Sequence, residues 1–292
     1  GMALVSQGKL KESIQAFDKA IQLNPDYVDA YSNRGIVLEQ LGQLDKAVAS
    51  CNQAIKLNPD FADAYNNCGN ALKGLGQLDR AVTSYDKAIQ LKPNYAEAYN
   101  NRGIVLEQLG QSDGAIKDYD KAIQLRPDYP EAYYNRGIAL RGLGQLDEAV
   151  ESYDKAIQLK PDYAKAHYNL GIVVHELGQS DEALKSYDKA IQLRPDYAEA
   201  YSNRGNILNL LGQLDESLKN FDKAIQLKPD YAEAYNNRGS ALVILGQLDE
   251  GFESFDKAIQ LKPDYDGAYS NLLMTLNYTP DLNVIDHIAT AR

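Results

Sequence analysis

The segment AEAYNNRGIVLEQLGQSDGAIKDYDKAIQLRPDY, residues 96–129, decides the fold of this chain. Its first half carries apolar residues at helical spacing and ends at Gly110, a residue suited to the left-handed cap that closes a helix. Its second half begins with Asp113, whose carboxylate favours a helix N-terminus through the helix dipole, and is stopped by Pro127. The segment therefore predicts a helix, a tight turn and a second helix.

The same segment recurs along the chain with a fixed period. Proline returns every 34 residues, at Pro25, Pro59, Pro93, Pro127, Pro161, Pro195, Pro229 and Pro263. A constant period of this length means that one supersecondary unit is copied in tandem and that each copy stacks on the last. We therefore predict one elongated all-α domain, which grows in one dimension and needs no central core.

Small residues predict that the two helices of each unit approach closely. Glycine is found mid-helix at Gly35, Gly69, Gly103, Gly137, Gly171, Gly205 and Gly239. Each costs about 1 kcal/mol relative to alanine, so close packing must offset the cost. A matching alanine column on the second helix is formed by Ala54, Ala88, Ala122, Ala156, Ala190, Ala224 and Ala258. Most of the 21 tyrosines fall in three columns, represented by Tyr99, Tyr119 and Tyr129, which we interpret as packing residues.

This pattern of tyrosine, glycine, alanine, aromatic, alanine and proline in a 34-residue unit resembles the tetratricopeptide repeat over nearly the whole chain. The resemblance implies a right-handed superhelical solenoid of helix-turn-helix repeats whose first helices line a concave groove. Tyrosine replaces the family's usual tryptophan, and arginine replaces the usual leucine before the glycine at Arg34, Arg102, Arg136, Arg204 and Arg238. We expect these arginines to lay their stems on apolar surface and to keep their heads in water.

The two ends of the chain depart from the repeat. Residues 1–27 match only the later part of a unit, so we expect a truncated first repeat and a natural N-terminal portion before it. Residues 28–265 hold seven full repeats, and residues 266–277 supply the first helix of a further, capping repeat. Residues 278–292 are expected to form a junction and a short capping helix. The truncated repeat exposes apolar surface, so self-association through the terminal repeats is also expected.

The composition of the chain excludes several classes of partner. A formal net charge of −11 and a pI near 4.8 argue against binding to nucleic acid or to an anionic membrane. Two cysteines, Cys51 and Cys68, are too few for a disulfide framework and fit a reducing compartment. With no signal peptide or long apolar run, the sequence predicts a cytoplasmic protein.

No motif indicates an active site, a metal site or a cofactor site. There is no HExxH, no CxxC pair, no phosphate loop and no nucleophile elbow. We therefore expect a non-catalytic chain without a cofactor. The recurrent Asp-Lys pairs, such as Asp120-Lys121, are interpreted as solvated helix charges.

The geometry of the family places the asparagine before each arginine-glycine pair on the concave face. This asparagine column comprises Asn33, Asn67, Asn101, Asn135, Asn169, Asn203, Asn237 and Asn271. An amide offers an acceptor and two donors, so such a ladder can bond the main chain of an extended peptide. Helices stacked about 10 Å apart would place one rung at roughly every third peptide residue. The alternative is that these asparagines bond only their neighbours in the scaffold.

Variable groove positions are where ligand selectivity can reside. Tyr134 and Arg141 are seven residues apart, and Tyr168 and His175 occupy the same two positions one repeat later, so we expect one shared binding patch. The alternative is that these four residues vary by chance at exposed positions and have no role in binding. Acids are expected to rim the groove and to favour basic or neutral ligands: Asp29, Asp63, Glu97, Glu131, Glu199 and Glu233 at the edge, and Glu39, Glu107 and Glu176 deeper. Apolar residues at Leu210, Val243 and Ile244 suggest a docking surface near the C-terminal end.

The stretch from Ser270 to Leu282 resembles the junction that follows the repeats in bacterial members of the O-linked N-acetylglucosamine transferase family. That resemblance covers about thirteen residues, and in the family two glycosyltransferase lobes follow it. It implies that this chain recruits substrates for a nucleotide-sugar-dependent protein glycosyltransferase while lacking the catalytic lobes itself. The alternative is a free-standing adaptor that assembles protein complexes.

A third interpretation, a co-chaperone that grips the acidic C-terminus of heat-shock chaperones, fits the sequence poorly. Asn70 and Asn101 could serve as the two asparagines of that clamp. However, Asn66, Glu131 and Asn135 stand where the resemblance requires cations. Because Glu131 would repel an acidic ligand, this interpretation is set aside.

Overall fold

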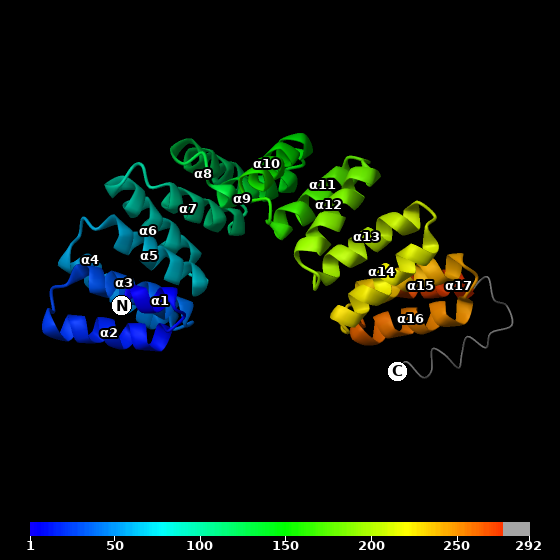
Figure 1. Cartoon of the computed structure of the whole chain (residues 1–292), viewed down its shortest axis with the longest axis horizontal. Coiled ribbons are helices and arrows are strands. Elements are labelled where there is room, and N and C mark those ends of the chain that lie inside the picture. The colour runs from blue at the N-terminus through cyan, green and yellow to red at the C-terminus, as the bar shows by residue number, and fades with distance from the viewer. Residues whose placement is uncertain (277–292) are drawn as a thin grey trace. The chain divides into compact units, whose positions relative to one another are not determined.

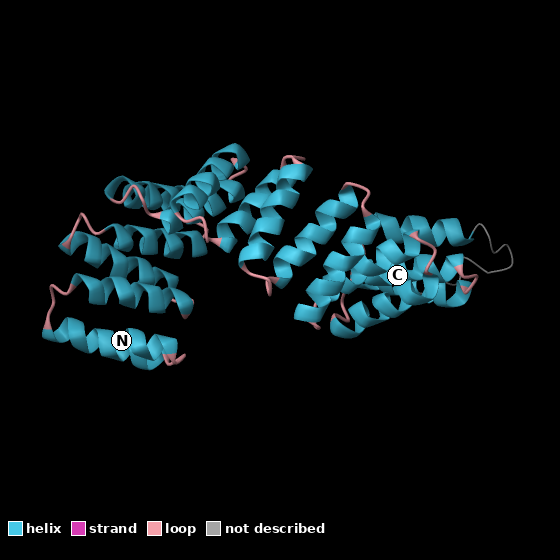
Figure 2. Cartoon of the chain, turned by 45° about the horizontal axis from the view of Figure 1, so that its top comes forward, coloured by secondary structure: helices cyan, strands magenta, loops and turns pink. Residues whose placement is uncertain are grey.

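The computed structural model describes residues 1–276, and in this part of the chain it contains helices joined by short turns, with no strand (Figures 1 and 2). The helices are α1 (Met2–Ser6), α2 (Leu10–Leu23), α3 (Val28–Gln40), α4 (Leu44–Leu57), α5 (Ala62–Gly74), α6 (Leu78–Leu91), α7 (Ala96–Gln108), α8 (Ser112–Leu125), α9 (Pro130–Gly142), α10 (Leu146–Leu159), α11 (Ala164–Glu176), α12 (Ser180–Leu193), α13 (Ala198–Leu210), α14 (Leu214–Leu227), α15 (Ala232–Ile244), α16 (Leu248–Leu261) and α17 (Asp266–Leu276). The predicted all-α repeat fold is confirmed. The expected junction and capping helix, residues 278–292, lie outside the described residues.

The helices belong to two compact units, which are described separately. The first, Gly1–Leu159, holds α1 to α10, and the second, Lys160–Arg292, holds α11 to α17. In both units an odd-numbered helix packs most extensively on the even-numbered helix that follows it. Within a unit, odd-numbered helices also contact the next odd-numbered helix, as α3 does α5 and α13 does α15. The odd-numbered helices therefore line a common face in each unit, which we call the odd-helix groove.

A glycine in the left-handed conformation forms the turn within each helix pair. Gly110 has a φ of 73°, which a residue with a side chain rarely adopts. The N–H of Gln111 donates to the carbonyl of Leu106 at 2.8 Å, and the N–H of Gly110 donates to the carbonyl of Glu107 at 3.0 Å. These bonds occupy carbonyls that the end of α7 leaves without helical partners. The predicted cap is confirmed.

The mid-helix glycines face an aromatic ring of the second helix rather than the alanine column. A β-carbon built on Gly103 would lie 2.7 Å from the Cε1 atom of Tyr119, which is too close for any real contact. The same relationship joins Gly69 to Tyr85, Gly137 to Tyr153, Gly171 to Tyr187, Gly205 to Phe221 and Gly239 to Phe255. The alanines are also fully buried, but the ring is what requires the glycine. A buried aromatic side chain thus offsets the cost of the glycine in these six repeats, whereas Gly35 faces the thiol of Cys51.

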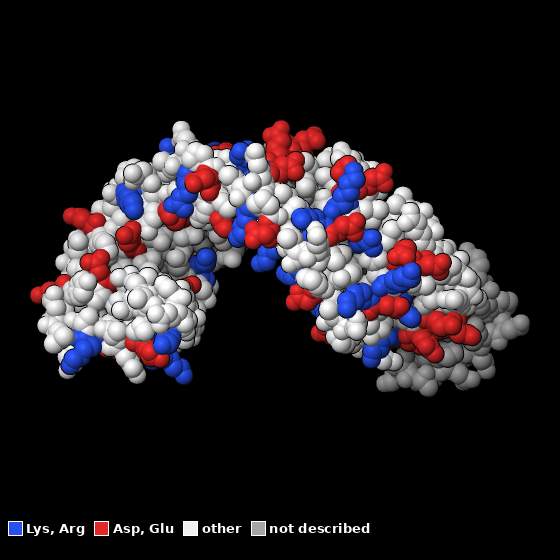
Figure 3. Space-filling view, viewed as in Figure 1, with Lys and Arg blue, Asp and Glu red and all other residues white. Residues whose placement is uncertain are grey.

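The arginine column forms ion pairs between repeats, which corrects two expectations from the sequence. The Nε of Arg136 donates to Oδ1 of Asp120 in the preceding repeat at 2.7 Å. Equivalent pairs are Arg34–Asp18, Arg102–Asp86, Arg204–Asp188 and Arg238–Asp222. The arginine heads are therefore not simply hydrated, and the acid of each Asp-Lys pair is not simply a solvated charge. Figure 3 shows acidic and basic side chains side by side on the face viewed.

One repeat boundary exchanges both members of this ion pair at once. Cys68 stands in the arginine column and Asn52 in the aspartate column, and the thiol of Cys68 lies 3.7 Å from Oδ1 of Asn52. Because both charges are missing together, neither is left without its partner at this boundary. At two later positions of the arginine column, Leu170 and Leu272, the aspartate column keeps Asp154 and Asp256, so the joint exchange is particular to this boundary.

Candidate functional site

Two cavities mark the odd-helix groove in the first unit. Side chains of α3 at helical spacing, Asp29, Asn33 and Ile36, line a cavity of about 460 Å³ together with Asp63 and Asn67 of α5. A smaller cavity of about 230 Å³ is lined by Ile36, Glu39, Asn67 and Asn70. Ile36 and Asn67 border both cavities, so the two are adjoining parts of one groove. The structure thus brings Asn33 and Asn67 of the predicted column together.

Most asparagines of the column also bond to the repeat before them. In each case the side-chain amide donates to the residue that precedes the column position one repeat earlier. The bonds are Asn67 to Ser32 (3.0 Å), Asn101 to Asn66 (3.1 Å), Asn135 to Asn100 (2.9 Å), Asn203 to Tyr168 (3.1 Å) and Asn271 to Asn236 (2.9 Å). Asn237 instead accepts from its neighbour Asn236 at 3.2 Å. The column therefore joins successive repeats in the described part of the chain.

These bonds leave part of each amide for other partners. A side-chain amide has two N–H donors and an oxygen with two lone pairs, and the bond to the preceding repeat uses one donor. All eight column residues are half-buried. Asn33 makes no side-chain hydrogen bond within residues 1–276. Contact between these amides and the main chain of a peptide stays a prediction. Where an inter-repeat bond is present, it fixes the orientation of the amide.

Four of the acids at the rim of the groove, Asp63, Glu97, Glu199 and Glu233, are paired with cations, which changes their expected effect. Arg126, which follows α8, donates to Glu97 of α7, and Lys92 lies 3.7 Å from Asp63. In the second unit Lys228 pairs with Glu199 at 3.3 Å and Lys262 with Glu233 at 3.5 Å. Burial acts to raise the pKa of Glu97, but the hydrogen bond and charge of Arg126 bring it below its usual value. At these four positions the rim thus carries ion pairs rather than unpaired acids.

The cations of these ion pairs were not predicted from the sequence. Lys92, Arg126, Lys228 and Lys262 follow the ends of even-numbered helices, 29 residues after the acids they pair with. Each also lies over a tyrosine ring three residues later, as Arg126 does over Tyr129 at 4.7 Å from the ring centroid. Only the recurrence of the cation at a fixed offset from the acid could have revealed the pairing.

Buried polar atoms without a hydrogen-bond partner concentrate at one position of the repeat. Of the four such atoms among the described residues, three are Oε2 of Glu107, Nδ1 of His175 and Oδ1 of Asn209, which occupy the same repeat position. Glu39, which lines the smaller cavity, also occupies it. Buried polar groups are nearly always satisfied in proteins. The position therefore carries unused hydrogen-bonding capacity on the groove side of the odd-numbered helices.

Tyr134 and Arg141 lie on α9 in the first unit, while Tyr168 and His175 lie on α11 in the second. Tyr134 packs on Tyr153 with ring centroids 6.0 Å apart. Tyr168 packs on Tyr187 at 5.9 Å and on Tyr197 at 4.7 Å. Both tyrosines therefore contribute to packing, which the sequence analysis did not expect. That the four residues share one patch stays a prediction, because it joins residues of two units.

The apolar residues near the C-terminal end are exposed at two of the three predicted positions. Leu210 is 71% exposed and Ile244 is 62% exposed. Val243 instead packs against the hydrophobic cluster that Phe252 and Phe255 form. The expected docking surface is thus smaller than the sequence suggested.

Within residues 1–276, no group of three or more His, Cys, Asp or Glu side chains is arranged to hold a metal ion. Among the helices of this part, none combines the length and the apolar character that a membrane span requires. Both cysteines are buried and free.

Comparison with protein families identifies the repeat. The model described as "TPR repeat" matches seven overlapping segments: residues 1–42, 38–76, 72–110, 108–142, 139–178, 173–210 and 205–243. The model described as "Tetratricopeptide repeat" matches residues 232–265. A search of the curated proteins finds no match.

Solved structures with similar folds include two at or above 28% identity. The chain is similar to YrrB, described as a TPR protein with an unusual peptide-binding site, at 28% identity over 65% of this chain and 97% of YrrB, with a TM-score of 0.55. It is similar to MamA at 30% identity over 56% of this chain and 96% of MamA, with a TM-score of 0.53. The pilF protein of Pseudomonas aeruginosa shares the fold, with a TM-score of 0.65 at 18% identity over 72% of this chain and 95% of that one.

Proposed function

The chain belongs to the tetratricopeptide repeat family, and on that premise we propose that its odd-helix groove binds extended segments of other proteins through their main chain. The chain acts as a non-catalytic scaffold in this proposal. One observation carries it: Asn33 and Asn67, from successive repeats, line the same cavity of about 460 Å³. Two neighbouring amides in one cavity can bond a peptide's N–H and C=O groups without contacting its side chains.

Two further observations support the proposal. The inter-repeat bonds hold the asparagine amides in fixed orientations, which lowers the entropy lost when a ligand binds. YrrB, a relative that the chain resembles, is described as having a peptide-binding site.

A backbone-modified peptide tests main-chain recognition. Binders are selected from a displayed library of short random peptides, and the best one is resynthesised with N-methylated backbone amides. The N-methylated copy keeps every side chain but loses its N–H donors, so its affinity is expected to fall by at least tenfold, about 1.4 kcal/mol. Equal affinity of the two peptides would exclude capture through the main chain, and a library without binders would exclude the function.

The finer part of the proposal is that the groove recruits substrates for a protein glycosyltransferase resembling the O-linked N-acetylglucosamine transferases. The stretch from Ser270 to Leu282 supports it, and the described residues include this stretch as far as Leu276, in α17. The open reading frame beyond Arg292 tests it. A coding region for two nucleotide-binding lobes is expected, whereas an immediate stop codon would favour the free-standing adaptor. The free, buried cysteines are consistent with the cytoplasm as the site of action.

A further inference from the structure

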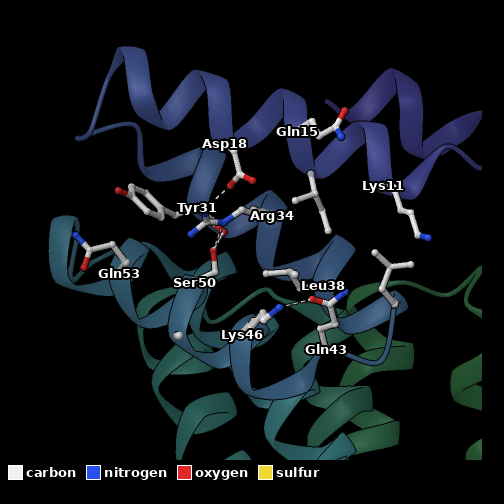
Figure 4. Close-up of a pocket in the computed structure, with 13 residues that line it drawn as sticks. Lys11, Gln15, Asp18, Tyr31, Arg34, Leu38, Gln43, Lys46, Ser50 and Gln53 are labelled. Atoms are coloured by element: carbon white, nitrogen blue, oxygen red, sulfur yellow. Dashed lines mark hydrogen bonds and ion pairs between the residues drawn. The ribbon is translucent and has the colours of Figure 1, made fainter.

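A cavity separate from the odd-helix groove lies between two even-numbered helices. Its volume is about 640 Å³, and its walls are α2 and α4, with α3 beneath them (Figure 4). It shares no lining residue with the two groove cavities. It lies wholly within the first unit.

Apolar side chains and a polar network form the base of this cavity. Ile14, Leu38 and Leu41 supply apolar lining, and Leu38 is buried. Near them, Nη1 of Arg34 bonds Oδ1 of Asp18 at 2.6 Å and its Nε donates to Ser50 at 3.0 Å. Figure 4 shows this network on the Tyr31 side of the cavity and Lys11 on the other. Asp18, which supplies the one carboxylate among the residues that line the cavity, is therefore already paired with a cation.

Two lysines give the cavity a positive charge that other repeats lack. Lys11 stands where the later repeats have aspartate, at Asp45, Asp79, Asp113, Asp147, Asp181, Asp215 and Asp249. Lys46 stands where most other repeats have glutamate, at Glu12, Glu148, Glu182, Glu216 and Glu250. Lys46 donates to the amide oxygen of Gln43 at 3.0 Å, and neither lysine has an ion pair with a carboxylate among residues 1–276. In a chain of net charge −11, this surface is a local exception.

One wall of the cavity carries an unusually small residue for its repeat position. Ala49 lines the wall from α4. At the same position the other repeats carry longer side chains, at Gln15, Thr83, Lys117, Glu151, Lys185, Lys219 and Glu253. Three departures from the repeat, at Lys11, Lys46 and Ala49, thus meet at one cavity.

We propose that this cavity is a second binding site, which takes an acidic peptide segment with an adjacent apolar side chain. The carboxylates bond Lys11 and Lys46, and the apolar side chain packs on Ile14 and Leu38. Charge complementarity selects this occupant: the lining has three cations against one paired carboxylate. The site does not depend on peptide binding in the odd-helix groove.

A labelled peptide tests the proposal on the full chain. The probe is a fluorescein-labelled serine-glycine peptide that carries two adjacent glutamates followed by leucine, titrated by fluorescence anisotropy. Lys11→Asp combined with Lys46→Glu is expected to weaken binding by at least about tenfold, because both charge-assisted bonds are lost. Ala49→Gln is expected to weaken it similarly, because it adds a longer, uncharged side chain to the wall of the cavity. Other repeats carry each of these residues at the same position, so the fold tolerates them.

Control variants distinguish binding in this cavity from non-specific charge attraction and from binding in the odd-helix groove. Lys117→Glu changes an exposed charge of the same sign on α8 and is expected to keep the affinity of the unchanged chain for this peptide. Loss of binding on Asn33→Ala would place the peptide in the odd-helix groove and overturn the proposal. No binding at millimolar peptide, equal binding of a peptide with glutamines for the glutamates, or unchanged affinity of the double lysine variant would each overturn the proposal. A dimer in sedimentation that Ala49→Gln disrupts would assign the cavity to a second copy instead.

Discussion

The side-chain amide of Asn135 donates a 2.9 Å hydrogen bond to the amide oxygen of Asn100, one repeat earlier. The two residues are 35 positions apart, one more than the repeat length, so the bond ties the first helix of one repeat to the first helix of the repeat before it. A residue that we propose to bind peptide thus also holds the scaffold together. Substitutions in the asparagine column are therefore expected to affect both peptide binding and stability, and the balance between the two effects should differ from one asparagine to the next.

Alanine substitution at two rungs separates binding from stability. Asn33→Ala is expected to weaken peptide binding with little change in the free energy of unfolding, because Asn33 makes no bond to the scaffold within residues 1–276. Asn135→Ala is expected to cost about 1 kcal/mol of stability, since it leaves Asn100 without its donor. Urea titration followed by circular dichroism measures both variants. Equal destabilisation of the two would show that the bond to Asn100 contributes nothing.

Adding one methyl group at a mid-helix glycine is expected to destabilise the chain. Gly103→Ala places a β-carbon 2.7 Å from the ring of Tyr119, and the overpacking should cost about 1–3 kcal/mol, more than the gain in helix propensity. The control is Gly114→Ala on α8, whose β-carbon would meet only Leu106 at an ordinary 3.4 Å. That variant is expected to be unchanged or more stable. A stable Gly103→Ala protein would mean that Tyr119 can move aside.

The inter-repeat ion pair can be measured with residues that the array already uses. Arg136→Leu and Asp120→Asn copy Leu170 and Asn52 of other repeats. A double-mutant cycle should give a coupling energy of about 0.5–1 kcal/mol, because the pair is partly exposed and screened by solvent. The coupling should fall as salt is raised. A value near zero at low salt would show that the contact adds no stability.

Alkaline pH is expected to unfold the chain. Burial raises the pKa of Tyr119 above its ordinary value, with the charges of Glu107 and Asp118 adding to the effect, and burial likewise raises the pKa of Tyr85. Above pH of about 10 the unfolded chain loses these protons while the folded chain retains them, so stability is full below that pH and falls as pH rises.

Replacing one ring hydroxyl checks this assignment. Tyr119→Phe should make stability fall less steeply as pH rises, measured by circular dichroism together with tyrosinate absorbance. Phe221 and Phe255 show that phenylalanine fits this repeat position. If tyrosinate forms well before helicity is lost, the buried rings do not control the transition.

Much of the local structure follows from residues close together in the sequence. The turn at Gly110, the end of α8 before Pro127 and the pairing of helices all depend on contacts within one repeat, so the 34-residue pattern predicts them. The need for glycine at Gly103 was also predicted. Its partner, Tyr119, was not, because the pattern does not specify which side chain of the second helix the glycine faces.

The sequence by itself determined the repeat, its two helices, their turn and the columns of asparagine and arginine. Tertiary structure alone decided what those columns touch: partners 16, 29 and 35 residues away, in Arg136–Asp120, Arg126–Glu97 and Asn135–Asn100. These contacts depend on the angle and offset at which one repeat packs on the next, which no single repeat encodes. The cavity between α2 and α4 arises in the same way, since Lys11 and Ala49 meet only when their repeats stack.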